Sequence, residues 1–296
     1  MTTLNSPDLS AHHLTVIGAG TMGHGIAGQA ARCGAQVTLY DTSADALNRG
    51  MKQIEQSYAK GVKKGKLSAE EVGAARARIT LASLTSERPL LRACEGATLV
   101  IEAAPERLDL KRSIFAEVEE VVDEHALLAT NTSSLSIDKI AEGLRHPRRF
   151  IGMHFFNPVA VMPLLELVRG SRTSEDTVTL ARQLGEALLK TPIVVKDSPG
   201  FATSRLGIAL GNEAMRIFEE GVASAEDIDR AMVLGYRHPI GPLALTDLVG
   251  LDVRLAISEY LYSQLGTDTF KPPQVLQDKV ARGELGKKSG QGFYEY

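Results

Sequence analysis

The 296-residue sequence has little of what marks several classes of protein. It contains no tryptophan and only 5% aromatic residues, and its 33 Lys and Arg nearly balance its 36 Asp and Glu, for a formal net charge of -3. Such a charge exerts no general attraction on nucleic acid or on an anionic membrane surface. The sequence contains no run of about 18 apolar residues, the length that a membrane-spanning helix needs. We therefore expect neither nucleic acid nor membrane as a partner.

Cysteine and the N-terminal stretch indicate where the protein works. Cys33 and Cys94 are too few for a disulfide framework and lack metal-ligand spacing. The opening residues, MTTLNSPDLSAHH, show no charged region followed by an apolar run, as an export signal would. We expect a soluble, cytoplasmic protein with two inert thiols, no metal site and no cleaved export signal.

What is present is an ordinary globular composition, 44% hydrophobic and 23% charged, enough for a sizeable core. From His13 to about Lys196, short β-rich runs alternate with helical patterns, which predicts a parallel sheet. The predicted strands are LTVIG from Leu14, QVTLY from Gln36, ITL from Ile79, TLVIE from Thr98, ALLAT from Ala126, RFIGMHF from Arg149, LLELV from Leu164 and PIVV from Pro192.

Helical patterns occupy nearly all of the sequence after Asp197, so we expect two domains, 1–196 and 197–296, the second all-α. Residues 201–221 and 224–235 each predict a helix, the latter capped by Ser224. Residues 246–266 are more apolar than a solvated helix needs, which indicates burial against another subunit. We therefore expect a homodimer through the C-terminal domain.

The segment GAGTMG follows a predicted strand and opens a helix, the context that the G-x-G-x-x-G dinucleotide fingerprint requires. Gly18 permits the tight turn, Gly20 lets the backbone approach a pyrophosphate, and Gly23 allows close helix packing. The first helical turn, with Thr21 and Met22, supplies N–H donors. A purely structural turn is the alternative. We expect an α/β fold with a Rossmann-type, mostly parallel sheet.

Asp41 ends the second predicted strand about 20 residues further on, where a carboxylate can accept the ribose hydroxyls of the cofactor. The next residues, Thr42, Ser43 and Ala44, offer no cation to bind a 2′-phosphate. The expected cofactor is therefore NAD rather than NADP. Asp41 or Ser43 could instead cap the following helix.

His154 and Glu166 form a candidate acid–base pair. Glu166 interrupts the apolar run LLELV, where an ionised carboxylate is costly unless it is paired. His154, twelve residues earlier in HFFNP, could be its partner, since a carboxylate fixes the tautomer of a histidine and stabilises its protonated form. From spacing alone, the alternative that Glu166 meets a structural Arg or Lys has the greater weight.

Several motifs occur together and in order: GAGTMGHGIA, VIEAAPE, NTSS, HFFNP followed by LLELV, DSPGF and SGQGFYEY. From about Leu14 to Tyr296 the sequence thus resembles the L-3-hydroxyacyl-CoA dehydrogenase family of fatty acid metabolism, and most of all the bacterial 3-hydroxybutyryl-CoA dehydrogenases. The resemblance implies NAD-dependent oxidation of an (S)-3-hydroxyacyl-CoA to the 3-oxoacyl-CoA. It also implies a two-domain protomer whose helical C-terminal domain dimerises.

The resemblance assigns roles by position. It implies that His154 is the general base and Glu166 its orienting carboxylate, with Ser133 and Asn157 near the substrate hydroxyl and thioester. Asn131 and Glu106 would neighbour the nicotinamide and its ribose, with Lys111 nearby. Ser57 and Lys64 would contact coenzyme A. Ser204 departs from the pattern, because many relatives carry Asn there as a substrate contact.

Each of these assignments has an alternative. Asn131, Ser133 and Ser134 could cap a turn, and Glu106 and Lys111 could belong to a helix start. The lysines from Lys60 to Lys66 could be a solvated helix end. The substrate could be another hydroxy acid, such as 3-hydroxyadipyl-CoA or a sugar acid. A nucleotide-binding protein without turnover is a further possibility.

Overall fold

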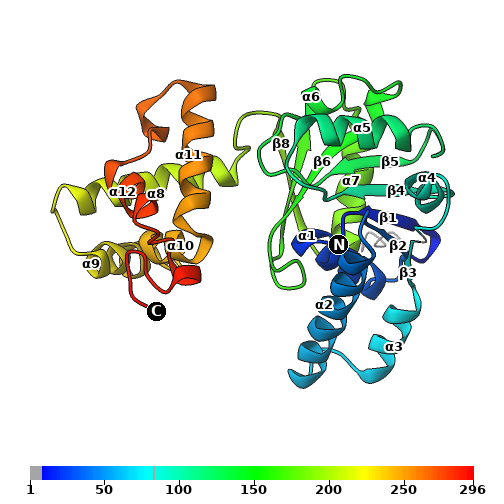
Figure 1. Cartoon of the computed structure of the whole chain (residues 1–296), viewed down its shortest axis with the longest axis horizontal. Helices are drawn as coiled ribbons and strands as arrows, with labels where there is room; N and C mark the ends of the chain where they lie inside the picture. Colours follow the sequence, from blue (N-terminus) through cyan, green and yellow to red (C-terminus); the bar gives the residue numbers. More distant parts are fainter. Residues whose placement is uncertain (1–8, 83) are drawn as a thin grey trace, which may run out of the picture. The chain divides into compact units, whose positions relative to one another are not determined.

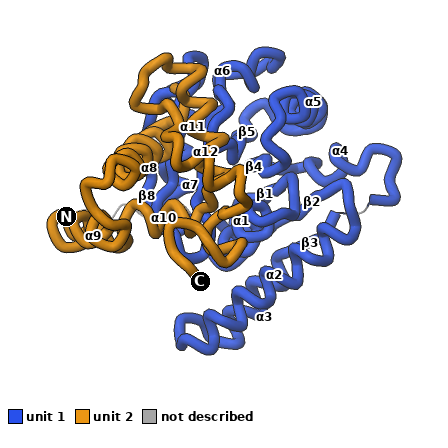
Figure 2. The backbone as a smooth tube through the Cα atoms, turned by 60° about the vertical axis from the view of Figure 1, so that its left-hand side comes forward, with its two compact units in different colours: residues 1–197 blue, residues 198–296 orange. Residues whose placement is uncertain are grey.

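The computed structural model describes residues 9–82 and 84–296, and the chain divides into unit 1, up to Asp197, and unit 2, Ser198–Tyr296 (Figure 2). No helix in the described residues is long and apolar enough to cross a membrane. Nor do any three His, Cys, Asp or Glu side chains gather among them as ligands for a metal ion.

Unit 1 is built on one eight-stranded sheet in the order β3-β2-β1-β4-β5-β6-β7-β8 (Figure 1). All neighbours run parallel except β6 and β7, which are antiparallel. This confirms the predicted fold class and every predicted strand. The strands are β1 (His13–Ile17), β2 (Gln36–Tyr40), β3 (Ile79–Leu81), β4 (Leu99–Glu102), β5 (Leu127–Thr130), β6 (Phe150–Phe155), β7 (Leu164–Arg169) and β8 (Thr191–Lys196).

The helices of unit 1 follow the sequence signals at their ends. Ser43, not Asp41, caps α2, and Ser68 and Glu71 form the capping box of α3. Val62, near the end of α2, is 40% exposed, and α2 and α3 project beyond the sheet (Figure 1). The helices are α1 (Thr21–Arg32), α2 (Ala44–Lys63), α3 (Ala69–Ala77), α4 (Pro89–Cys94), α5 (Leu108–Val118), α6 (Ile137–Ile140) and α7 (Glu175–Ala187).

The two faces of the sheet carry different side chains. Alternate residues of β6 and β7, such as Met153 and Leu165, join a core shared with α1, α2 and α7. Their neighbours His154 and Glu166 point to the opposite face, since successive side chains of a strand alternate. On that face Phe115 of α5 packs edge-on against Phe150, with ring centroids 4.7 Å apart.

The regular elements of unit 2 are helices, and isolated β-bridges join Gly286 to Gln291 and Gln291 to Glu295 near its C-terminal end. Ser224 caps α9 as predicted, but the helix expected over 224–235 continues as a π-helical segment from residue 231. The apolar segment 246–266 divides at Gly250, whose φ of 104 ends α10 and begins α11. The helices are α8 (Thr203–Glu219), α9 (Ala225–Arg230), α10 (Pro242–Val249), α11 (Leu251–Leu265) and α12 (Gln274–Ala281).

A buried carboxylate ties the C-terminal motif SGQGFYEY to unit 2. Asp247 accepts hydrogen bonds from the backbone N–H groups of Phe293 and Tyr294, both at 2.9 Å. A Cβ atom at Gly292 would come within 2.2 Å of the same carboxylate, so the close approach requires glycine. Within unit 2 this motif therefore has a structural role.

Candidate active site

The glycine loop after β1 is shaped to receive a phosphate group. Gly18 has a φ of +103, and a Cβ atom there would lie 2.6 Å from the carbonyl oxygen of Ala103; at Gly23 a Cβ would lie 1.7 Å from that of Gly18. At Gly20 a Cβ would meet nothing within 4 Å, and no side chain caps α1. A bare backbone before an uncapped helix N-terminus fits the pyrophosphate of a dinucleotide.

The other members of the fingerprint lie around this loop. Thr21 is exposed at the start of α1, whereas Met22 packs against the core. Asp41 follows β2, and its Oδ2 accepts the N–H of Ala19 at 2.9 Å while its Oδ1 accepts that of Ser43 at 3.0 Å. The carboxylate thus lies against the glycine loop, where an NAD-binding fingerprint places its acid.

His154 and Glu166 are in direct contact. They face each other in the antiparallel register of β6 and β7, and Nδ1 of His154 lies 2.8 Å from Oε2 of Glu166. Glu166 is fully buried and His154 is 7% exposed. The two strands therefore hold a histidine in one orientation through a carboxylate, the arrangement that a general base needs.

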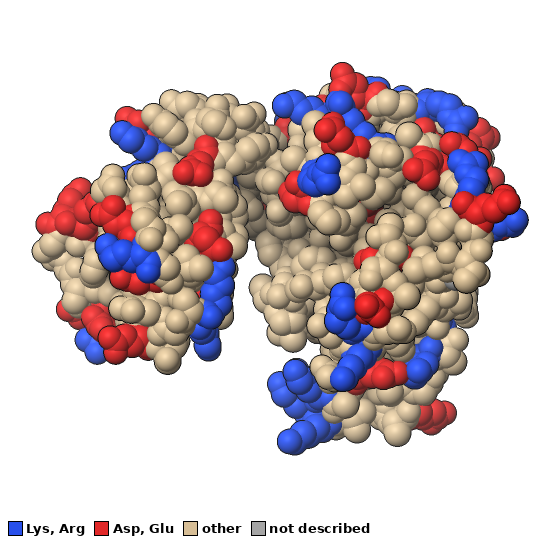
Figure 3. All heavy atoms as spheres, viewed as in Figure 1, with Lys and Arg blue, Asp and Glu red and all other residues tan. Residues whose placement is uncertain are grey.

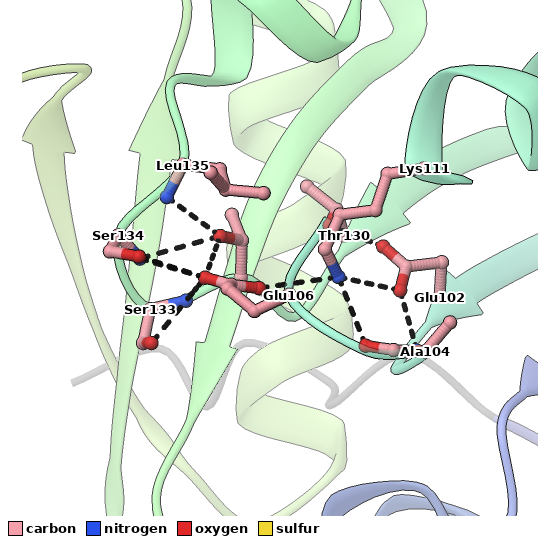
Figure 4. Close-up of polar contacts among 9 residues, drawn as sticks. Glu102, Ala104, Glu106, Lys111, Thr130, Ser133, Ser134 and Leu135 are labelled. Atoms are coloured by element: carbon pink, nitrogen blue, oxygen red, sulfur yellow. Dashed lines mark hydrogen bonds and ion pairs between the residues drawn. The ribbon is translucent and has the colours of Figure 1, made fainter. Parts of the chain in front are cut away.

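Glu106 accepts several hydrogen bonds from the loop that follows β5 (Figure 4). Its Oε1 accepts hydrogen bonds from Thr132 Oγ1 at 2.5 Å, from the N–H of Ser133 at 3.0 Å and from Ser134 Oγ at 3.0 Å. Burial by itself would raise the pKa of the Glu106 carboxyl, but the hydrogen bond from Thr132 and the charge of Lys111 help to lower it. Glu106 is therefore an ionised anchor for the segment that carries Ser133.

Lys111 lies behind Glu106 in a buried pair with Glu102 (Figure 4). Its Nζ is 2.6 Å from Oε1 of Glu102 and 3.4 Å from Oε2 of Glu106, and neither Lys111 nor Glu102 is exposed at all. Thr130 Oγ1 and the N–H of Ala104 also donate to Glu102, at 2.6 and 2.5 Å. Because its ammonium is enclosed, Lys111 can influence a bound ligand only indirectly, through its ion pair with the partly exposed Glu106.

Asn131 connects the end of β5 to β6. Its side-chain oxygen accepts the N–H of Phe155 at 2.9 Å, and its own N–H donates to the carbonyl of Glu102 at 2.7 Å. The residue thus holds the carboxyl ends of β4, β5 and β6 together, next to His154. Ligands of parallel α/β sheets bind at this edge.

A cavity of about 570 Å³ lies between α1, α2 and the loop after β6. Ser57 and Lys64, expected to contact coenzyme A, both line it, and so does Asn157. Lys and Arg side chains gather at the outer end of α2 (Figure 3). Lys60, Lys64, Lys66 and Arg32 lie on the cavity wall, whereas Lys63 does not. The cavity is thus polar and cationic on one side.

The remaining expected residues lie elsewhere. Ser204 belongs to unit 2, in the first turn of α8, where it is partly exposed. Burial raises the pKa of the thiol of Cys94 to about 12 and raises that of Cys33, as suits unreactive cysteines.

Sequence reasoning missed three polar residues that support the site. Glu102 and Thr132 are fully buried partners of Lys111 and Glu106. Lys190 is buried too, and its Nζ donates to the carbonyls of Val159 and, at 2.9 Å, of Met162. Lys190 thereby holds the loop that contributes to the cavity wall. Glu102 could have been found by the argument applied to Glu166, since it ends an apolar strand.

Comparison with known proteins identifies the family. Residues 13–198 match the family model for the NAD binding domain of 3-hydroxyacyl-CoA dehydrogenase, and residues 200–296 match the model for its C-terminal domain. The chain is 41% identical to a 3-hydroxybutyryl-CoA dehydrogenase of Clostridioides difficile, over 96% of this chain and 99% of that protein. It is 42% identical to a 3-hydroxyadipyl-CoA dehydrogenase of Escherichia coli, over 97% of this chain and 60% of that one.

A solved structure agrees with these matches. The crystal structure of (S)-3-hydroxybutyryl-CoA dehydrogenase from Ralstonia eutropha is 43% identical and superposes with a TM-score of 0.90, covering 96% of this chain and 99% of that one. Family models and relatives agree over nearly the whole length, and the resemblance seen in the motifs is confirmed. The chain therefore belongs to the family of NAD-dependent 3-hydroxyacyl-CoA dehydrogenases.

Proposed function

We propose that this protein oxidises a short (S)-3-hydroxyacyl-CoA, such as 3-hydroxybutyryl-CoA, to the 3-oxoacyl-CoA in the cytoplasm. The observation that carries the proposal is the 2.8 Å contact between His154 and Glu166 at the edge of the sheet where ligands bind. The names of the relatives support the substrate class.

His154 acts as the general base in this proposal. With the ring proton on Nδ1, His154 donates a hydrogen bond to the carboxylate of Glu166, and Nε2 is the ring nitrogen that takes the hydroxyl proton of the substrate. As the proton leaves, the hydrogen on C3 departs with its electron pair and the C3–O bond becomes a carbonyl. Glu166 stabilises the resulting imidazolium because its carboxylate is already in place and buried.

NAD, when bound, supplies the acceptor for that hydride. The glycine loop would hold its pyrophosphate and Asp41 its ribose, as the bare backbone at Gly20 supports. We infer that Glu106 and Asn131 border the nicotinamide ribose. Lys111 then acts indirectly, as the buried counter-charge that fixes Glu106.

Ser133 and Asn157 would orient the oxygens of the substrate. Glu106 accepts the N–H of Ser133 at 3.0 Å, which keeps the serine in position, and Asn157 lines the cavity beside α2. Ser204, in the first turn of α8, would be a further substrate contact. A serine there is shorter than asparagine and offers a hydroxyl in place of an amide.

The cavity beside α2 would bind coenzyme A. Its volume of about 570 Å³ lies within the usual range for small-molecule sites. Ser57 offers a hydroxyl, and Lys64 with its neighbouring cations can meet the phosphate charges of the ligand. The location of Lys64 on the cavity wall supports this role over that of a purely solvated helix end.

We also infer a homodimer formed through unit 2. Leu206 of α8 and Leu248 of α10 are 71% and 57% exposed, and Val253 of α11 is 41% exposed. Several large apolar side chains at the surface of one small unit are typical of an interface. Light scattering at micromolar concentration should give the mass of a dimer, and a monomer would contradict this inference.

The proposed function is tested by the NADH absorbance produced from 3-hydroxybutyryl-CoA and NAD. His154→Gln should lower kcat by about 10²–10⁴-fold, the contribution expected of a general base. NADH binding, followed by fluorescence, should be unchanged. His125→Gln is the matched control, because His125 is exposed on the same unit. A near-wild-type kcat for His154→Gln would refute the assignment.

A further inference from the structure

A histidine lies at the start of α1, directly after the glycine loop. Nδ1 of His24 is 2.7 Å from the carbonyl oxygen of Gly20, which also accepts the backbone N–H of His24 at 3.1 Å. A carbonyl oxygen only accepts hydrogen bonds, so Nδ1 carries the ring proton and donates it. Nε2 of the neutral ring is therefore an acceptor. Among the described residues, no hydrogen bond or ion pair reaches Nε2.

The imidazole of His24 forms part of the wall of the cavity beside α2. His24 and Gly25 line the cavity together with Thr21, about one turn earlier, and Gly28, about one turn later, so a single face of α1 borders it. His24 is only partly buried. Because Nδ1 is bound to Gly20, Nε2 is the ring nitrogen available to a ligand in the cavity.

His24 lies at the inner end of this cavity, where three segments converge. A Cβ atom at Gly25 would be 2.9 Å from Cγ2 of Val159 in the loop after β6, and one at Gly50 of α2 would be 3.5 Å from Cβ of His24. Lys60 follows Gly50 by ten residues, which is about 15 Å along the axis of α2. The cations therefore occupy the outer end of the cavity and His24 the inner end.

Backbone acceptors in the loop after β6 are already used. The carbonyl of Pro158 accepts two N–H groups of the same loop, both at 2.9 Å. Nζ of Lys190 donates to the carbonyls of Val159 and Met162. An N–H group of a ligand that is enclosed at this end without an acceptor would weaken binding. Nε2 of His24 can accept such a group without breaking an existing hydrogen bond.

We propose that Nε2 of His24 accepts a hydrogen bond from an amide N–H of the pantetheine arm of the bound thioester. This inference rests on the proposed function, which binds coenzyme A in this cavity. Asn157 lines the same cavity and follows the catalytic His154 by three residues. With the phosphates at the outer cations and the thioester near Asn157, the arm crosses the inner part of the cavity. Its two amides supply the N–H groups, and His24 thereby orients the arm.

The test compares 3-hydroxybutyryl-CoA with 3-hydroxybutyryl-pantetheine, which keeps the arm and its amides but lacks the nucleotide and its phosphates. His24→Phe retains a ring and removes both nitrogens. Its kcat/KM should fall by about 2- to 10-fold with either thioester, as expected for the loss of one neutral hydrogen bond. The change should lie in KM, because the contact is remote from C3. His24→Ala, which needs no extra space beside Gly50, should show the same loss.

Two further variants separate this contact from others. Lys64→Ala should raise KM for the CoA thioester and leave that for the pantetheine thioester unchanged, because Lys64 would meet a phosphate. His125→Phe is the matched control and should change neither value, since its side chain is 88% exposed. A pantetheine thioester that is oxidised too slowly is measured as an inhibitor of the CoA reaction, and the same factors should appear in its inhibition constant.

Three results would overturn the inference. One is an unchanged KM for both thioesters in His24→Phe and His24→Ala. Another is a loss confined to the CoA thioester, which would assign His24 to the phosphates. The third is a fall in NADH affinity, measured by fluorescence, as large as the rise in KM, because His24 would then act by supporting the glycine loop through Gly20. A wild-type protein that oxidises neither thioester would instead refute the proposed function.

Discussion

Replacing Lys111 by methionine should destabilise unit 1 strongly. The ammonium of Lys111 lies 2.6 Å from Glu102 with both side chains fully buried, so the substitution leaves a carboxylate enclosed without its counter-charge. Breaking a buried pair in this way costs about 3–5 kcal/mol. At about 2–4 °C per kcal/mol for a unit of this size, the midpoint of thermal unfolding should fall by roughly 6–20 °C.

The loss of stability in Lys111→Met should depend on pH, and the titration of Glu102 sets the direction of that dependence. Burial raises the pKa of the Glu102 carboxyl, and the charge of Lys111 is the largest opposing cause, so removing Lys111 raises that pKa further. A group whose pKa is higher in the folded protein stabilises it at low pH and loses this effect as pH rises through the folded value. The stability of Lys111→Met should therefore be closest to that of the wild type near pH 5, and the difference should grow toward pH 8.

Thermal unfolding followed by circular dichroism at both pH values checks this, with Arg76→Met as the control. Arg76 and Glu55 form a 2.8 Å pair whose side chains are 57% and 44% exposed, so its loss should cost no more than about 1 kcal/mol. The double variant Lys111→Met with Glu102→Gln should recover part of the loss. A single variant no less stable than the control, or equally affected at both pH values, would refute the reasoning.

The remaining predictions concern the site. Glu166→Gln should lower kcat by about 10²-fold and alter the pH–rate profile, because the amide cannot stabilise a protonated His154; an unchanged profile would make Glu166 structural. The enzyme should use NAD far better than NADP, since Asp41 repels a 2′-phosphate, and comparable kcat/KM values would contradict this. Lys64→Ala should raise KM for CoA thioesters at nearly constant kcat, whereas Lys63→Ala, outside the cavity wall, should not.

Much of the fold could be predicted because its signals are local. Each strand of unit 1 is a short apolar run, and the caps at Ser43, Ser68 and Ser224 are single polar residues just before a helical pattern. The glycine loop is equally local, since its three glycines and its flanking strand and helix lie in one stretch of chain. The sequence also indicated that Glu166 needs a partner, because an acid stood inside an apolar strand.

Other features depend on which segments meet. The sequence left open whether His154 or a basic residue faces Glu166, and the antiparallel register of β6 and β7 decides it. Nor could composition show that Lys111 is enclosed, because that depends on α5 covering the end of β4 beside Glu102. Periodicity reports which side of an element is apolar, whereas the partner of a buried charge is set by long-range packing.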